Sequence, residues 1–331
     1  MLKFDEPKLI DSVNGALKLR SEVEKIVDEI WEKGFDNIYY LGIGGTYASS
    51  MQAVTYINGK SNLPVYVQHA AEYYTTGNKR LTDKSIVILS SVTGTTQEVV
   101  KATKEIKELG ATIISFVDLP NTPLADMGDY LITYPMNEQL KFFMAADRFM
   151  YRNGEFDDYE DYYQELEAHL AIGLVETEKA ADDFGREFAE KHRHDSMHYF
   201  IGAGNQWGGV YSYAMCYWEE QSWLPSKSIH AAEFLHGTLE IVEETTPVTL
   251  FIGEDEQRLL SERVANLLPR ICANYTIIDS KDYALEGISE KYRGRLSHLV
   301  THCVTQRIDA HVEKLNCHPL DIRRYYRQFD Y

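Results

Sequence analysis

The sequence repeats itself across its two halves. His69-Ala-Ala-Glu72 spells the same four residues as His230-Ala-Ala-Glu233, 161 positions later. Three further pairs of segments match in the same order, at offsets of 160, 162 and 164: Leu41-Gly-Ile-Gly44 with Ile201-Gly-Ala-Gly204, Ile86-Val-Ile-Leu89 with Val248-Thr-Leu-Phe251, and Thr112-Ile-Ile-Ser115 with Thr276-Ile-Ile-Asp279. Four ordered matches with so little drift are not expected by chance, so two similar halves are predicted.

Each half alternates short apolar segments with helical stretches of about a dozen residues, which is typical of a parallel sheet flanked by helices. The prediction is an α/β protein with two subdomains, each a mostly parallel five-stranded sheet between helices. We expect the first subdomain, with its lead-in helices, at residues 1–155 and the second at 191–331. A helical, acidic connection is expected over residues 156–190.

Composition indicates the cellular compartment of the protein and excludes some classes of binding partner. The 51 acidic residues against 33 Lys and Arg give a net charge of −18, which repels nucleic acid and anionic membranes. The four cysteines form no CxxC pair, which favours a reduced, cytoplasmic protein over a disulfide framework or a zinc site. The N-terminus lacks a signal-peptide pattern, and no apolar run is long enough to span a membrane.

The two halves differ where an anion would bind. In the first half, Ser90-Ser91-Val-Thr93-Gly-Thr-Thr96 ends a strand and opens a helix, so hydroxyls and backbone N–H groups can hold a phosphate without a lysine. The second half has Ile252-Gly-Glu-Asp-Glu256 there, whose carboxylates would repel phosphate. A phosphate site is therefore expected in the first half, although such residues also cap helices routinely.

A second glycine-rich turn, Gly42-Ile-Gly-Gly-Thr46, also joins a strand to a helix and offers further donors. Its spacing lacks the third glycine of the dinucleotide motif GxGxxG, so we do not expect NAD to bind.

The apolar stretch Trp207–Trp223 contains two candidate acid–base groups, Glu219 and Glu220, and His236 follows 16 residues after Glu220. A carboxylate in apolar surroundings has a raised pKa and can carry protons, and a histidine beside it can serve a neighbouring oxygen. The alternative is that both glutamates end a helix at the surface and that His236 is a satisfied core residue.

His230 and Glu233 share this ambiguity. Because the first half repeats them as His69 and Glu72 without the rest of the motif, a structural role is favoured for the tetrapeptide.

These motifs resemble those of double-SIS (sugar isomerase) phosphosugar proteins over nearly the whole chain. The chain is similar to the isomerase half of glucosamine-6-phosphate synthase and, more closely, to the fructosamine-6-phosphate deglycases. Gly44-Gly45-Thr46 resembles the family's first phosphate turn, and Ser91–Thr96 its Ser-x-Ser-Gly-x-Thr loop. Ala232–Thr238 resembles Gly-Glu-Phe-x-His-Gly-Pro, with alanine and threonine replacing the first glycine and the proline.

The resemblance implies two SIS-type subdomains and a deglycase that hydrolyses a 6-phosphorylated sugar–amino acid adduct to a hexose 6-phosphate and a free amino acid. The family's catalytic glutamate lies 16 residues before the histidine, which selects Glu220 rather than Glu219. Glu220 and His236 would then make an enaminol and an imine. The residues implied in phosphate binding are Gly45, Thr46, Ser91, Thr93 and Thr96.

The resemblance also implies a homodimer or higher oligomer in which His236 reaches an active site across a subunit boundary. No metal and no organic cofactor are expected, because no ligand cluster with suitable spacing is present.

The C-terminal tail separates two branches of the family. The synthase tail carries a lysine that forms a Schiff base with the sugar, whereas here no lysine follows Lys314. Arg323, Arg324 and Tyr325 are instead expected to bind the substrate, followed by Tyr326 and a closing Phe329-Asp330-Tyr331 that resembles the deglycase tail. The tail therefore favours a deglycase.

Two alternatives stay open: an aldose–ketose phosphosugar isomerase that uses the same Glu220 and His236, and a non-enzymatic SIS protein that binds sugar phosphates. Lysine and asparagine adducts are both possible substrates. The acidic, tyrosine-rich run Glu155–Tyr163 is interpreted either as an attractor for a cationic substrate or as a solvated helix face.

Overall fold

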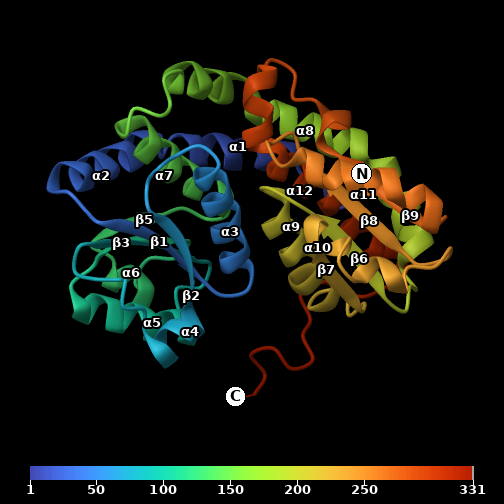
Figure 1. The fold of residues 1–331 in the computed structure, drawn as a ribbon, viewed down its shortest axis with the longest axis horizontal. Helices are drawn as coiled ribbons and strands as arrows, with labels where there is room; N and C mark the ends of the chain where they lie inside the picture. The colour runs from blue at the N-terminus through green and yellow to red at the C-terminus, as the bar shows by residue number, and fades with distance from the viewer. Residues whose placement is uncertain (330–331) are drawn as a thin grey trace. The chain divides into compact units, whose positions relative to one another are not determined.

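The structure is a computed structural model that describes residues 1–329 (Figure 1). It divides into an N-terminal unit, Lys8–Ala168, and a C-terminal unit made of Met1–Pro7 together with the chain from His169 onward. The first residues join the C-terminal unit because Arg307 donates a hydrogen bond to the carbonyl of Leu2 at 2.7 Å. Among the described residues, no helix combines the length and the apolarity needed to cross a bilayer.

The N-terminal unit is built on one parallel sheet of five strands in the order β2-β1-β3-β4-β5. Its elements are α1 (Glu6–Leu17), α2 (Arg20–Lys33), β1 (Asn37–Gly42), α3 (Gly45–Asn58), β2 (Val65–His69), α4 (Ala70–Thr76), β3 (Ser85–Ser91), α5 (Gln97–Leu109), β4 (Thr112–Val117), α6 (Pro123–Met127), β5 (Tyr130–Thr133), α7 (Glu138–Arg152) and the start of α8 (Tyr159–His192).

Both faces of this sheet are covered, which explains why its strands are apolar almost throughout. Alternate side chains of a strand point to opposite faces. Tyr39 and Leu41 belong to the core under α4, α5 and α6, whereas Tyr40 packs against Phe142 of α7 with ring centroids 5.1 Å apart. Figure 1 shows these two helical layers on either side of the sheet.

The C-terminal unit contains a four-stranded parallel sheet in the order β7-β6-β8-β9. Its elements after α8 are β6 (His198–Gly202), α9 (Gln206–Ser212), the π-helix η1 (Tyr213–Glu219), β7 (Ser226–His230), α10 (Ala231–Phe234), the 3-10 turn η2 (Thr238–Ile241), β8 (Val248–Ile252), α11 (Arg258–Ile271), β9 (Tyr275–Asp279), the 3-10 turn η3 (Ser280–Tyr283) and α12 (Glu290–Asn316).

The two units share topology and register, which confirms the predicted α/β class with two similar halves. In each, the first strand lies between the second and the third. Gly42 pairs with His69 in the N-terminal sheet, and Gly202 pairs with His230 in the C-terminal sheet. The repeated histidine therefore ends the second strand of each unit, and the repeated Ala-Ala-Glu opens the short helix that follows.

The predicted fifth strand of the second half is wrong for the described residues. The position equivalent to β5 falls inside α12, and residues 284–289 run against α8 instead of extending the sheet. Leu285 and Ile288 are buried, and a Cβ on Gly287 would lie 2.5 Å from the ring of His169. Because this segment buries its apolar side chains against a helix, it does not pair with the edge of β9.

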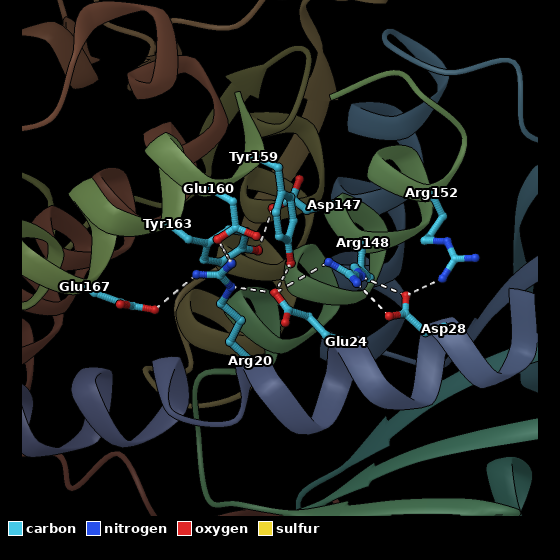
Figure 2. A network of polar contacts seen from close by, with 10 residues as sticks. All are labelled: Arg20, Glu24, Asp28, Asp147, Arg148, Arg152, Tyr159, Glu160, Tyr163 and Glu167. Atoms are coloured by element: carbon cyan, nitrogen blue, oxygen red, sulfur yellow. Dashed lines mark hydrogen bonds and ion pairs between the residues drawn. The ribbon is translucent and has the colours of Figure 1, made fainter. Parts of the chain in front are cut away.

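Charges and tyrosines connect α2, α7 and the start of α8 (Figure 2). Arg20 forms ion pairs with Glu24 at 2.6 Å and Glu160 at 2.5 Å, and its guanidinium lies 4.6 Å from the ring centroid of Tyr163. The run Glu155–Tyr163 therefore does attract a cation, but the cation belongs to the chain itself. Its three tyrosines are each 1% exposed, so for them both the substrate-attracting and the solvated-face interpretations are wrong.

A buried carboxylate lies at the centre of this network. Asp147 accepts hydrogen bonds from the hydroxyls of Tyr56 at 2.6 Å and Tyr163 at 2.8 Å, and only 1% of the residue is exposed. Burial, followed by the neighbouring charge of Asp147, raises the pKa of Tyr163 well above its ordinary value. The two phenols both donate to Asp147 and so link α3 and α8 through one side chain of α7.

Replacing Tyr163 by Phe should lower the free energy of unfolding by about 1–3 kcal/mol, because a buried carboxylate oxygen loses its donor. Tyr151→Phe is the matched control: Tyr151 is 39% exposed, and its variant should stay within about 0.5 kcal/mol of the wild type. Urea denaturation of both variants measures the difference. Equal stability of the two would contradict the assigned role of the hydroxyl.

Candidate functional site

The residues predicted to bind phosphate lie at one edge of the N-terminal sheet. β1 and β3 are parallel neighbours, so the turns at their carboxyl ends share that edge. Gly45 and Thr46 start the helix after β1, whereas Ser91, Thr93 and Thr96 follow β3. Ligands of open parallel sheets bind in the crevice outside the carboxyl ends of the strands.

The turn after β3 is folded by its own hydroxyls. The backbone N–H of Gly94 donates to Ser91 Oγ at 2.9 Å, and the hydroxyl of Thr95 donates to Thr93 Oγ1 at 3.1 Å. Gly94 has φ +65°, and a Cβ there would lie 2.0 Å from Thr122 Oγ1. A glycine is therefore required at this position for two independent reasons.

The helix that follows this turn begins without a side-chain cap. Thr96 occupies the cap position of α5, but its side chain makes no capping hydrogen bond to the helix. The interpretation of this motif as a plain helix cap is therefore not supported for Thr96. The first N–H groups of a helix without such a cap are suited to an anion.

The backbone of the turn after β1 also lies very close to its neighbours, in this case the start of α3. A Cβ on Gly42 would lie 2.5 Å from the backbone nitrogen of Tyr47, and Gly44 has φ +59°. Thr46 Oγ1 accepts a hydrogen bond from the N–H of Ile43 at 3.1 Å and donates to its carbonyl at 3.0 Å. Thr46 thus stabilises the turn, and its hydroxyl lies in the first turn of α3.

In the C-terminal unit, the chain's own carboxylate occupies the equivalent edge. A Cβ on Gly204, the counterpart of Gly44, would lie 2.0 Å from Asp255 Oδ1. Burial raises the pKa of Asp255, and the N–H of Gln257 donates to it at 2.9 Å. This arrangement explains physically why the second half is unsuited to phosphate, as its acidic turn predicts.

Glu220 lies where a π-helix ends. Its N–H bonds to the carbonyl of Met215 at 3.0 Å, five residues earlier rather than four. The wider turn separates the two adjacent glutamates. Glu219 accepts from the hydroxyl of Ser226 at 3.4 Å, whereas Glu220 Oε1 accepts from Arg323 Nε at 2.8 Å. π-helical turns occur frequently at functional sites.

The C-terminal tail folds back onto this helix end. His318 Nε2 lies 2.9 Å from the carbonyl of Gln221, and the guanidinium of Arg324 lies 4.0 Å from the ring centroid of Trp223. The helix end and the tail border an open pocket of about 440 Å³, lined by Met197, Glu219, Glu220, Trp223, Leu224, Pro225, Ser226, Arg323, Arg324, Tyr325 and Tyr326. The predicted base and the predicted tail residues thus converge, while Asp330 and Tyr331 lie outside the described residues.

His236 is exposed, so the alternative of a satisfied core histidine is wrong. It follows α10, where its N–H donates to the carbonyl of Glu233 at 2.9 Å. His230, by contrast, accepts from the N–H of Ala232 through Nδ1 at 3.2 Å, and burial lowers its pKa. These contacts support a structural role for His230 and leave His236 available for chemistry.

Within residues 1–329, one group of side chains has the composition of a metal site: His192, Asp195 and His198, with ligand atoms within 4.8 Å of one another. Both histidine Nδ1 atoms already lie 2.7 and 2.9 Å from Asp195 Oδ2. Burial raises the pKa of Asp195, but the two histidines outweigh it and bring the value to about 2. Burial lowers the pKa of His198 to about 4. The same atoms that would bind a metal thus join the end of α8 to β6.

The family model described as "SIS domain" matches residues 30–147, within the N-terminal unit. This stretch of the chain is a SIS domain. The chain is 27% identical to fructosamine deglycase FrlB of Bacillus subtilis, over 95% of this chain and 98% of that protein. It is 26% identical to fructoselysine 6-phosphate deglycase of Escherichia coli, over 92% of this chain and 89% of that one.

A solved structure from Bacillus subtilis that carries the provisional name phosphosugar isomerase superposes with a TM-score of 0.88 at 26% identity. The superposition covers 94% of this chain and 97% of the chain in that structure. The resemblance to SIS-domain deglycases expected from the sequence is confirmed, and the same fold extends through the C-terminal unit.

Gly94→Ala should weaken the binding of fructose 6-phosphate to the SIS domain at least about tenfold, because both the positive φ and Thr122 oppose a Cβ there. Gly77→Ala is the matched control, since Gly77 has φ +67° but open space around its Cβ position. Titration calorimetry measures the affinity of both variants, and the difference between them separates the effect of backbone strain from damage to the anion site. An equal loss of affinity in both would contradict the assignment.

Proposed function

We propose that this chain is a deglycase that hydrolyses a 6-phosphorylated sugar–amino acid adduct, of the fructoselysine 6-phosphate or glucoselysine 6-phosphate type. The products would be a hexose 6-phosphate and a free amino acid. The observation that carries the proposal is the contact between Glu220 and Arg323 in one pocket, in a chain that aligns with deglycases over most of its length. A carboxylate base suits a mechanism that begins with loss of a proton. A tail without lysine does not suit a mechanism that begins with a Schiff base.

The 6-phosphate would bind Thr46, Ser91, Thr93 and Thr96 together with backbone N–H groups from Gly45 and the start of α5. Neutral donors of this kind are compatible with a chain of net charge −18. Helix N-termini supply partial positive charge without a fixed cation.

Glu220 would remove the proton from the carbon beside the carbonyl, since a positioned glutamate can act as a general base. His236 would transfer the proton on the sugar oxygen or assist ring opening. Protonation of the resulting enaminol at the neighbouring carbon gives an imine. Water then adds to the imine carbon, the C–N bond breaks, and the amino acid leaves.

The tail would bind the amino acid half. Arg323 orients Glu220, and Arg323, Arg324 and Tyr325 offer donors to the α-carboxylate that all amino acid adducts share. Because Arg20 already pairs with the acidic run that starts α8, that run gives no preference for a lysine adduct. We further propose a homodimer in which His236 serves the site of a neighbouring subunit, and a cytoplasmic location.

An aldose–ketose phosphosugar isomerase is the second candidate, favoured by the provisional name of the Bacillus subtilis structure. The same Glu220 and His236 would suffice for it. Incubation with glucose 6-phosphate or fructose 6-phosphate alone distinguishes the two functions, since a deglycase should leave both sugar phosphates unchanged.

Glu220→Gln and His236→Ala should each reduce the release of free amino acid from fructoselysine 6-phosphate by about 10²–10⁴-fold, the usual contribution of a proton carrier. The control is Glu243→Gln, which removes an exposed carboxylate outside this pocket, and turnover should stay within about threefold. Circular dichroism confirms that each variant is folded. Wild-type turnover by Glu220→Gln would mean that the base is misassigned.

A further inference from the structure

The loop between β5 and α7 belongs to the same edge of the N-terminal sheet as the two phosphate turns. It is anchored to α1, where the hydroxyl of Tyr134 donates to the carbonyl of Ser12 at 2.8 Å and the amide of Asn137 donates to Ser12 Oγ at 2.8 Å. Met136 and Asn137 have φ values of +62° and +54°. Two successive left-handed residues other than glycine persist only where their surroundings determine the conformation.

A buried ion pair holds the loop in this conformation. Lys141, which is 0% exposed, donates from Nζ to the carbonyl of Tyr134 at 2.7 Å and lies 3.4 Å from Asp118 Oδ1. Asp118 Oδ2 accepts the N–H of Met136 at 3.1 Å. Burial lowers the pKa of Lys141, an effect that Asp118 opposes. Lys141 therefore fastens the loop to the end of β4, and its complete burial excludes it as an imine-forming lysine.

The loop delivers one carboxylate to the phosphate edge. Glu138, the first residue of α7, is hydrogen-bonded to the side chains of Ser49 and Ser90, and part of its surface stays accessible. Ser90 directly precedes the phosphate loop, and Ser49 lies one turn after Thr46. Burial, the largest effect, raises the pKa of Glu138, which the two serines oppose.

A carboxylate at this edge is unexpected beside a phosphate site, because its negative charge weakens the binding of any anion that faces it. Its useful partners are hydroxyl groups, which donate hydrogen bonds to carboxylates. The charged side chains that act on Glu138 are Lys141 of the same helix and Asp118 after β4, which pair with each other. Among the described residues Glu138 itself forms no ion pair, so its charge remains beside the two phosphate turns.

We propose that Glu138 is a specificity-determining residue that accepts hydrogen bonds from the sugar hydroxyls beside the bound phosphate and excludes ligands with a second anionic group on the sugar chain itself. The proposal rests on the function proposed above, since it places a phosphosugar at this edge. It assigns a selection rule: phosphosugars whose sugar carbon chain is uncharged bind, and phosphosugars with a carboxylate on that chain do not.

Fructose 6-phosphate and 6-phosphogluconate test the rule, because they share the phosphate and differ by a carboxylate. Titration calorimetry on the full chain at pH 7.5 should give a preference for fructose 6-phosphate that falls at least about tenfold in Glu138→Gln. The control is Glu108→Gln, which removes the same charge from the exposed last turn of α5, and its preference should stay within about threefold of wild type. An unchanged preference in Glu138→Gln would overturn the proposal.

The pH dependence gives a second readout. As the pH falls through the raised pKa of Glu138, protonation removes the repulsion, so the preference for fructose 6-phosphate should decline in the wild type. The phosphate is common to both ligands and cancels in the ratio. The decline should be absent in Glu138→Gln, and a ratio independent of pH in the wild type would overturn the proposal even if that variant did not fold.

Failure of the proposal differs from failure of the proposed function. If the wild type binds fructose 6-phosphate and the ratio does not respond to Glu138, only the role of Glu138 is wrong. If the wild type binds neither ligand, the phosphosugar site itself is wrong.

Discussion

Parallel strand pairing is the constraint on which the rest of this structure depends. In a parallel sheet the carboxyl ends of all strands meet at one edge, so segments far apart in sequence become neighbours there. The N-terminal unit uses that edge to bring together the turns after β1 and β3 and the loop after β5. The C-terminal unit repeats the pairing to the same register, with Gly202 opposite His230 where Gly42 faces His69. The scaffold is thus common to both halves, and their chemistry lies in the turns.

The turns of the two units differ in charge: one presents neutral hydrogen-bond donors and the other presents a carboxylate. After β3, hydroxyl side chains precede a helix that Thr96 does not cap, whereas Asp255 lies beside Gly204 at the corresponding turn of the C-terminal unit. The C-terminal unit has instead a pocket in which Glu220, at the end of a π-helix, accepts a hydrogen bond from Arg323. Duplication followed by divergence of the turns explains how one fold provides two different sites.

The sequence predicted most of the scaffold because repetition and apolar alternation report local structure and core faces directly. The repeated tetrapeptide was assigned correctly to the shared scaffold, with His230 bonded to its own helix. Other features depended on contacts that no local pattern reveals. The missing fifth strand reflects packing of Leu285 and Ile288 against a helix, and the buried tyrosines of α8 include two that contact Arg20, which is distant in sequence. Glu138 had no motif, because an ion pair from β4 to α7 positions it.

The central claim is that the adduct is cleaved through loss of a proton from the carbon that bears nitrogen. Fructoselysine 6-phosphate with two deuterium atoms on that carbon tests it most directly, with the sugar phosphate product examined by mass spectrometry and NMR. The account predicts glucose 6-phosphate that keeps one deuterium at C1, because Glu220 removes the other. A product fructose 6-phosphate that retains both deuterium atoms would contradict it, since the C–N bond would then break without enolisation.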